Sequence, residues 1–162
     1  MFFAAAIAAA FTTDSLDAVL DAGLAEIPAR SRFAAMVADC RRWAKELPAW
    51  EDAWAACAAQ YGAYHWVHTL NNAALVVLAL LYGKKEFGPT ICLAVRGGWD
   101  TDCNGATAGS VLGVMLGARA IPRQWTAPFN NTVRSALFGF AENSISELAY
   151  RTVAVGKKVA GG

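Results

Sequence analysis

The hydrophobic positions of this chain recur mainly with helical spacing, and stretches in which apolar and polar residues alternate are hard to find. Residues 2–11 form one apolar helical segment. A second helix follows, with Thr13 or Asp14 as its expected cap. Its apolar residues recur every three or four positions, at Leu16, Val19, Leu20 and Leu24. The chain therefore begins with two predicted helices.

The middle of the chain continues the same pattern. Ser31 can cap a helix over 32–47, which Pro48 ends. A further helix is predicted over 49–62, closing at Gly62, and the segment "YHWVHTL" that follows is predicted to be a loop.

The rest of the chain also reads as helical. Strongly apolar residues at 71–83 predict a helix with Asn71 or Asn72 as its cap, and a short helix is predicted over 86–98. Further helices are predicted at 103–118, 129–141 and 144–158, with "IPRQWTAP" as a linker and Ser144 and Glu147 as a capping box for the last one. We therefore expect a single all-α domain spanning residues 1–162.

Composition narrows the class of protein. Hydrophobic residues make up 56% and charged residues 17%, which is typical of a folded chain. The net charge of +1 gives no general attraction to nucleic acids or anionic membranes, so we expect neither as a partner. Three of the four cysteines, Cys40, Cys57 and Cys92, lie in apolar helical segments, which favours reduced, buried thiols in a cytoplasmic protein.

Two apolar segments raise the question of export or membrane insertion. "MFFAAAIAAAF" is similar to the apolar core of a signal peptide, but no Lys or Arg precedes it, which favours a core helix. "NAALVVLALLY" is shorter than the roughly 20 residues that a membrane span needs. Residues 103–118 carry glycines with G-x-x-x-G spacing, but that helix is also short and begins at two aspartates.

The segment "GGWDTDCNG" at 97–105 carries the candidate chemistry. Asp100, Asp102, Asn104 and Gly105 match the start of a calcium-binding loop, but position 12 of that loop falls on Val111, where a bidentate Glu is required. A calcium-sensor loop is thereby excluded. Two aspartates one residue apart can instead direct oxygen ligands at a hard cation such as Mg²⁺ or Mn²⁺.

A helix cap is the simpler explanation for an aspartate at this place. One Asp is enough for a cap, however, and the second Asp, with Gly97 and Gly98 in front, favours a metal site. Glycines then recur every fourth residue along the next helix, at Gly105, Gly109, Gly113 and Gly117. Each glycine costs about 0.5–1 kcal/mol relative to alanine, so we expect another backbone to pack closely along this ridge.

The segment "GGWDTDCNGATAGSVLGVMLGARAIPRQW" resembles the C-terminal metal-binding segment of the ADP-ribosylglycohydrolase family. Upstream, "AAAIAAAF", "GLAEIPARSRF" and "NNAALVVLALLYGKKEFGPTICLAV" are similar to the family in the same order, so the resemblance covers nearly the whole chain. It implies an all-α orthogonal helical bundle that holds two Mg²⁺ or Mn²⁺ ions. It also implies hydrolysis of the glycosidic bond between ADP-ribose and a protein side chain or a small acceptor.

The resemblance also assigns residues. Asp100 and Asp102 are implied as metal ligands, and Cys103 stands where many family members have a liganding Thr. Gly97, Gly98 and Trp99 are implied to line the ribose–diphosphate side of the site, where Trp99 is an insertion relative to the plain "GGDTD" form.

His68 and Asn72 are implied to reach the substrate cleft. A His65–His68 metal pair is the alternative for these histidines, but no third ligand is near in sequence. The catalytic residue is not identified.

The chain departs from the family pattern in one respect. The Thr-Asp-Asp cluster and catalytic Glu of the family's first half are not found, and Thr13-Asp14 and Glu51-Asp52 look like helix caps. We therefore expect a C-terminal portion that pairs with an N-terminal half, binds divalent metal weakly by itself and hydrolyses little. The expected substrate is an ADP-ribosylated protein or a small ADP-ribose derivative. The alternative function is a non-catalytic helical module that binds ADP-ribose or a partner chain.

Overall fold

The computed structural model describes residues 1–161 and groups them into two compact units, Met1–Ile121 and a second that begins at Pro122. The single domain expected over 1–162 stays a prediction. The first unit is entirely helical, as predicted. Its helices are α1 (Phe2–Ala10), α2 (Leu16–Ala25), α3 (Arg32–Glu46), α4 (Trp50–Tyr61), α5 (Thr69–Tyr82), α6 (Phe87–Arg96) and α7 (Thr101–Leu116).

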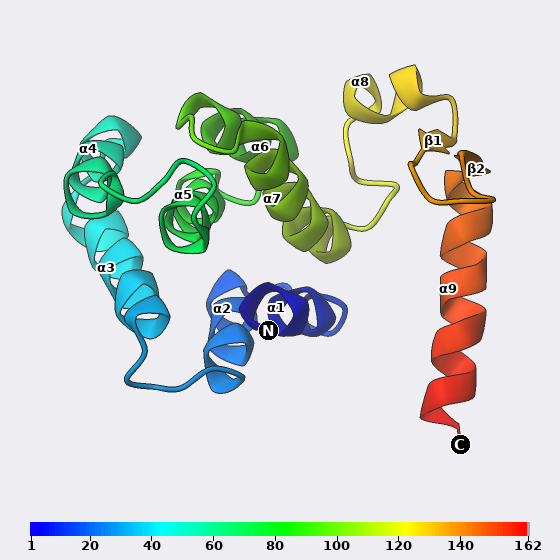
Figure 1. The fold of residues 1–162 in the computed structure, drawn as a ribbon, viewed down its shortest axis with the longest axis horizontal. Helices are drawn as coiled ribbons and strands as arrows, with labels where there is room; N and C mark the ends of the chain where they lie inside the picture. Colours follow the sequence, from blue (N-terminus) through cyan, green and yellow to red (C-terminus); the bar gives the residue numbers. More distant parts are fainter. Residues whose placement is uncertain (162) are drawn as a thin grey trace. The chain divides into compact units, whose positions relative to one another are not determined.

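Helix α5 is the centre of the first unit. Every residue from Leu70 to Leu80 is buried, which explains why the part of α5 from Ala73 onward is apolar on all sides rather than on one face. Figure 1 shows α5 nearly end-on, between α3 and α4 on one side and α6 and α7 on the other. Because α5 contacts α3, α4, α6 and α7, it holds these four helices in fixed positions.

Two hydrophobic clusters flank α5. One joins α5 to α2, α3 and α4 and contains Leu20, Met36, Trp43 and Leu78. The other joins α5 to α1, α6 and α7 and contains Val76, Ala94 and Val111. The middle of α7 is thus anchored to the core through its own buried face.

Most helix limits agree with the sequence pattern, but two caps differ. The side chain of Ser31 caps α3 as predicted, by accepting a hydrogen bond from the Ala34 N–H. Helix α2 is capped by Ser15, whereas Thr13 or Asp14 was expected, because the Ser15 side chain accepts from the Ala18 N–H. Helix α5 begins at Thr69 with His68 as its cap. Asn71 and Asn72 therefore lie inside the helix and do not cap it.

The thiols are all free, but only two are buried. Cys40 and Cys57 lie in the core as expected, whereas Cys92 is exposed. The buried positions of α6 are Thr90 and Ala94. Cys92 lies midway between them, which on a helix is the opposite face. The expectation of a buried Cys92 was wrong for this reason.

The glycine ridge of α7 is packed against side chains and not against a backbone. Cβ atoms built at Gly105 and Gly109 would each lie 3.2 Å from the tip of a side chain on α6, Val95 and Ile91 respectively. The expected contact with another backbone is therefore corrected, because the atoms next to these two glycines belong to α6 side chains. The glycines make a groove that receives α6 side chains.

The second unit departs furthest from the sequence pattern. It contains α8 (Arg123–Thr126), the 3-10 turn η1 (Ala127–Phe129), the strands β1 (Thr132–Arg134) and β2 (Glu142–Ser144), and helix α9 (Ile145–Ala160). The strands pair antiparallel, with Val133 opposite Asn143. Helix α9 begins as predicted, because the Ser144 side chain accepts from the Glu147 N–H.

The helix predicted over 129–141 is wrong. Asn130 and Asn131 adopt left-handed backbone angles, with φ of 45° and 55°, and Gly139 has φ of 76°. Asn130 and Asn131 directly precede β1, and Gly139 lies in the loop between β1 and β2. Asn and Gly tolerate the left-handed conformation best, and the segment forms a hairpin in place of a helix. The fold is all-α apart from this small hairpin. Among residues 1–161, no helix combines the length and apolar character that crossing a membrane requires.

Candidate metal centre

The loop between α6 and α7 has a shape that depends on glycine. Gly97 is buried, and a Cβ there would lie 2.6 Å from Leu75 Cδ2, so a larger residue fits only if the Leu75 side chain of α5 moves. Gly98 has φ of 82° and Trp99 has φ of 54°, both in the left-handed region. Two successive left-handed residues turn the chain sharply, and Asp100 consequently stands at the N-cap of α7, directly before its first residue.

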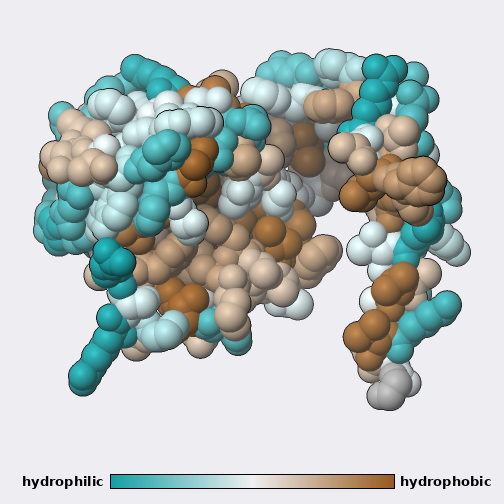
Figure 2. All heavy atoms as spheres, in the orientation of Figure 1, coloured by the Kyte–Doolittle hydropathy of each residue, from teal (hydrophilic) through white to brown (hydrophobic). Residues whose placement is uncertain are grey.

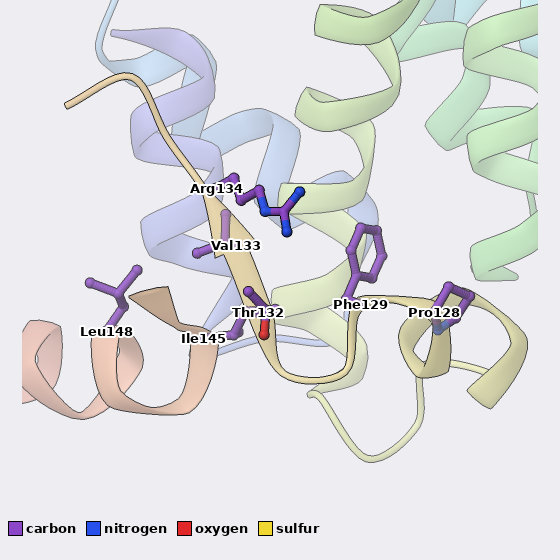
Figure 3. A pocket seen from close by; sticks show the side chains of 7 residues that line it. All are labelled: Pro128, Phe129, Thr132, Val133, Arg134, Ile145 and Leu148. Atoms are coloured by element: carbon purple, nitrogen blue, oxygen red, sulfur yellow. The ribbon is translucent and has the colours of Figure 1, made fainter. Parts of the chain in front are cut away.

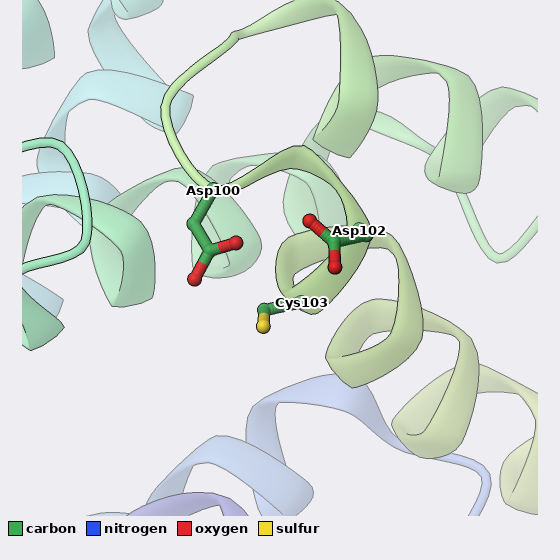
Figure 4. A group of neighbouring side chains, drawn as sticks. All are labelled: Asp100, Asp102 and Cys103. Atoms are coloured by element: carbon green, nitrogen blue, oxygen red, sulfur yellow. The ribbon is translucent and has the colours of Figure 1, made fainter. Parts of the chain in front are cut away.

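The start of α7 brings the three sequence-predicted metal residues together. Asp100 occupies the N-cap, and Asp102 and Cys103 lie in the first turn. One carboxylate oxygen from each aspartate and the Cys103 Sγ all lie within 4.8 Å of one another. Figure 4 shows the three side chains extending from the beginning of the helix into the same space. Asp100 is half-buried, while Asp102 and Cys103 are exposed, so an ion from solvent has access to the group.

The contacts of the Asp100 side chain distinguish a helix cap from a metal ligand. The Asp100 side chain forms no capping hydrogen bond with α7. Its carboxylate is therefore not occupied by the helix backbone and is available to a cation. The positive end of the helix dipole still favours the two negative charges, since both lie within the first turn.

The thiol is affected by its acidic neighbours. A hydrogen bond to Asp100 and the negative charge of that carboxylate raise the pKa of Cys103 above its usual value. A neutral thiol is a weak ligand for a hard cation, whereas the two carboxylates suit Mg²⁺ or Mn²⁺. The donor set thus fits such an ion through Asp100 and Asp102, with Cys103 beside them.

Two side chains from other helices hold the loop in place, and sequence reasoning did not identify either contact. The Trp54 Nε1–H of α4 donates a hydrogen bond of 3.0 Å to the Gly97 carbonyl. The Asn72 Oδ1 of α5 accepts from the Asp100 N–H at 3.1 Å and from Asn104 Nδ2 at 2.8 Å. These contacts join residues 28 to 43 positions apart, so no local pattern could have revealed them.

The predicted substrate residues His68, Trp99 and Asn72 differ in how far they are exposed to solvent. His68 caps α5, where its Nδ1 accepts from the Leu70 N–H at 3.1 Å, and its exposed ring stacks on Tyr64. Trp99 is half-buried against the core cluster of α2–α5. Asn72 is only 9% exposed. The substrate-binding roles of Gly97, Gly98, Trp99, His68 and Asn72 stay predictions.

The alternative of a metal pair at His65 and His68 gains no support. Among residues 1–161, Asp100, Asp102 and Cys103 make up the one group of three or more candidate ligands. The His65 Nδ1 accepts from the Val67 N–H at 3.4 Å, so this ring is engaged within its own loop. The two acids and the thiol of α7 are thus the centre that the described chain offers.

A separate depression of about 810 Å³ lies in the second unit (Figure 3). Its lining is mostly apolar and contains no carboxylate or thiol, so it lacks metal ligands. The residues are Pro128, Phe129, Thr132, Val133, Arg134, Ile145 and Leu148.

Comparison with known proteins gives one match. The sequence model of the family described as ADP-ribosylglycohydrolase matches residues 1–155. No curated protein and no solved structure matches the chain.

Proposed function

The chain belongs to the ADP-ribosylglycohydrolase family, and we propose that its α7 site is the metal-binding part of an active site that cleaves ADP-ribosyl glycosidic bonds. The family is one of hydrolases that act on ADP-ribose linkages. The observation that carries the metal assignment is the convergence of Asp100, Asp102 and Cys103 within 4.8 Å at the start of one helix.

The chain's own residues would each have a defined task. Asp100 and Asp102 would hold Mg²⁺ or Mn²⁺ through carboxylate oxygens, and Cys103 would stand beside them. A bound ion of this kind orients hydroxyl groups and makes a coordinated water more acidic. Gly97, Gly98 and Trp99 would offer the adjoining backbone and ring surface to the ribose and diphosphate. We propose an ADP-ribosylated protein or a small ADP-ribose derivative as the substrate.

The number of ions distinguishes a full site from a partial one. The resemblance implies two ions, and residues 1–161 present one group of ligands. Glu51 is not part of this group and forms an ion pair with Arg96 at 3.0 Å. We therefore propose that this chain alone binds one ion weakly, and that a partner polypeptide with a Thr-Asp-Asp cluster completes the site.

The test is calorimetric titration of Mg²⁺ and Mn²⁺ into the purified chain and into Asp100→Ala/Asp102→Ala. One weak binding event, lost in the double variant, supports the partial site. Two ions bound by the chain would show that it carries further ligands. No binding to the chain would refute the metal assignment. Cys103→Ser separates the thiol from the carboxylates: unchanged Mn²⁺ affinity excludes the Cys103 Sγ as a ligand.

A second measurement tests the reaction. Release of ADP-ribose from ADP-ribosylated protein is followed with Mn²⁺ present, using the double variant as the control. We expect little release by this chain alone and a metal-dependent increase when a polypeptide with the Thr-Asp-Asp cluster is added. In the presence of that polypeptide, equal release with the parent chain and with the double variant would contradict the proposed role of the α7 site.

A non-catalytic module is the second candidate function. The single ligand group among residues 1–161 favours it for this chain in isolation. It predicts saturable binding of free ADP-ribose without any turnover, including when the partner polypeptide is present. Turnover in that mixture would exclude it.

A further inference from the structure

Asn72 lies at the junction between the metal loop and the core, and its side-chain amide is fully used. Its Nδ2 donates to the carbonyl oxygens of Trp66 and His68, both at 2.8 Å. Its Oδ1 accepts from the Asp100 N–H and from Asn104 Nδ2. An amide offers two donors and two acceptor positions, so all four are occupied within the protein.

These four bonds connect three segments. The loop over 65–68 precedes α5, Asn72 itself is in the first turns of α5, and Asp100 and Asn104 belong to the start of α7. Asn104 is 2% exposed, which places its bond to Asn72 in the core. A hydrogen bond is strongest and most directional where water does not compete for it. Asn72 thus fixes the backbone of Asp100 to the most buried helix of the unit.

The loop needs such an attachment. Trp99, a bulky residue, is held at φ of 54°, a conformation that persists only where surrounding contacts enforce it. Trp54 holds the entrance of the loop through the Gly97 carbonyl. Asn72 holds its exit through the Asp100 N–H, at the residue whose carboxylate faces Asp102 and Cys103.

We propose that Asn72 is a positioning residue that sets the place of the Asp100 carboxylate from behind, and is not itself a substrate contact. Its effect on metal affinity rests on the proposed function, while its effect on the position of Asp100 does not. With its amide fully bonded inside the protein, Asn72 has no donor or acceptor left to direct at a ligand. It acts on the site through the backbone of Asp100.

Asn71 provides a matched control. It is the preceding residue on α5, it is fully buried, and its Nδ2 donates to the His65 carbonyl at 3.3 Å. It thus binds the same loop before α5 but has no hydrogen bond to α7. Asn71→Ala and Asn72→Ala both remove a buried amide from the same helix, and only the second detaches Asp100.

The first measurement is amide hydrogen exchange at Asp100 without metal. We expect Asn72→Ala to reduce protection of the Asp100 N–H by roughly 10-fold or more relative to the parent chain, and Asn71→Ala to leave it unchanged. Asn72→Asp is the second variant, because a carboxylate oxygen can still accept from the Asp100 N–H, and it should retain protection. Unchanged protection in Asn72→Ala, or lost protection in Asn72→Asp, overturns the proposal.

The second measurement is Mn²⁺ titration of the same variants. We expect Asn72→Ala to weaken Mn²⁺ binding about 10- to 100-fold, as is typical when a residue that orients a ligand is removed. In an Asp100→Ala background, Asn72→Ala should have no further effect, because Asn72 acts through Asp100. Equal losses in Asn71→Ala and Asn72→Ala would overturn the proposal. If the parent chain binds no Mn²⁺, the proposed metal site fails, and the exchange data alone decide the role of Asn72.

Discussion

At the scale of single residues, the same chemical group has opposite surroundings in two parts of the molecule. The Asp100 and Asp102 carboxylates reach solvent at a helix start, where no capping bond uses Asp100. Asp39 is instead committed to structure: its Oδ2 accepts from Tyr61 Oη at 2.6 Å and its Oδ1 pairs with Arg42 at 3.1 Å. Among residues 1–161, no ion pair involves Asp100 or Asp102, and this separates the two carboxylates of the metal candidate from Asp39.

The buried thiol of Cys57 leads to a prediction on pH. Burial raises the pKa of Cys57 from 9.0 to about 12. Between these values the unfolded chain loses this proton and the folded chain keeps it, so the folded state loses stability as pH rises above 9. One group contributes a slope of up to about 1.4 kcal/mol per pH unit in that range.

Urea unfolding of the parent chain and of Cys57→Ala at pH 8, 9, 10 and 11 measures this effect. The free energy of unfolding should fall with pH in both, because burial and nearby negative groups also raise the pKa of Cys40. The fall should be shallower in Cys57→Ala. Since the variant also removes a buried sulfur, its absolute stability is lower, and the slopes are what must be compared. Parallel slopes would contradict the prediction.

At the scale of elements, substitution by alanine should have opposite effects on the stability of the fold at two glycines, Gly83 and Gly113. A Cβ at Gly83, where α5 ends, would lie 2.8 Å from Thr90 Cα and 2.8 Å from the Ala79 carbonyl oxygen, so backbone must move. A Cβ at Gly113 in α7 would meet only side-chain atoms, Ile121 Cδ1 at 3.6 Å and Phe87 Cε2 at 3.7 Å, which is ordinary contact.

We therefore expect Gly83→Ala to destabilise the fold by about 1–3 kcal/mol through strain. Gly113→Ala should stabilise it by about 0.5–1 kcal/mol, since alanine is the better helix former. Thermal unfolding followed by circular dichroism measures both shifts. A lowered midpoint for Gly113→Ala would indicate that the α7 groove has no room for even one methyl group.

The elements also show which parts of the fold the sequence could predict. Helices α3, α5 and α7 were predicted with small errors at their ends, because apolar spacing and caps such as Ser31 are local signals. The β1–β2 hairpin was missed, because the apolar residues of 129–141 also fit a helical period. Asn130 and Asn131 adopt left-handed backbone angles, which are incompatible with a continuous α-helix in this segment.

The candidate site also has one part that the sequence could predict and one part that it could not. Asp100, Asp102 and Cys103 are neighbours in sequence, so their gathering at one helix start could be predicted from the motif alone. The supports of the loop, Trp54 and Asn72, come from helices that only the folded chain brings near Gly97 and Asp100. Sequence reasoning placed Asn72 at the site through resemblance, but its four hydrogen bonds are visible only in three dimensions.

At the scale of the whole molecule, burial is concentrated in the first unit. Among residues 1–161, every buried side chain precedes residue 113. In the second unit, large apolar side chains are exposed on both the hairpin and α9 (Figure 2), including Leu137, Phe138, Tyr150 and Val159. Hydrophobic burial is the main favourable term in folding, so the first unit carries the stability of the chain.

This distribution leads to a prediction for the chain cut after Ile121. The piece 1–121 contains both hydrophobic clusters, the metal group, and the contacts from Trp54 and Asn72 that hold its loop. We expect it to unfold cooperatively, with a midpoint close to that of the full chain. Its Mn²⁺ affinity should lie within about 3-fold of that of the full chain, because none of these groups is removed.

The piece 122–162 should show no cooperative transition, since it buries no side chain of its own among the described residues. Circular dichroism melts and Mn²⁺ titration of both pieces provide the measurement. A large loss of stability in 1–121 would instead show that the exposed apolar residues of the second unit contribute to the stability of the first.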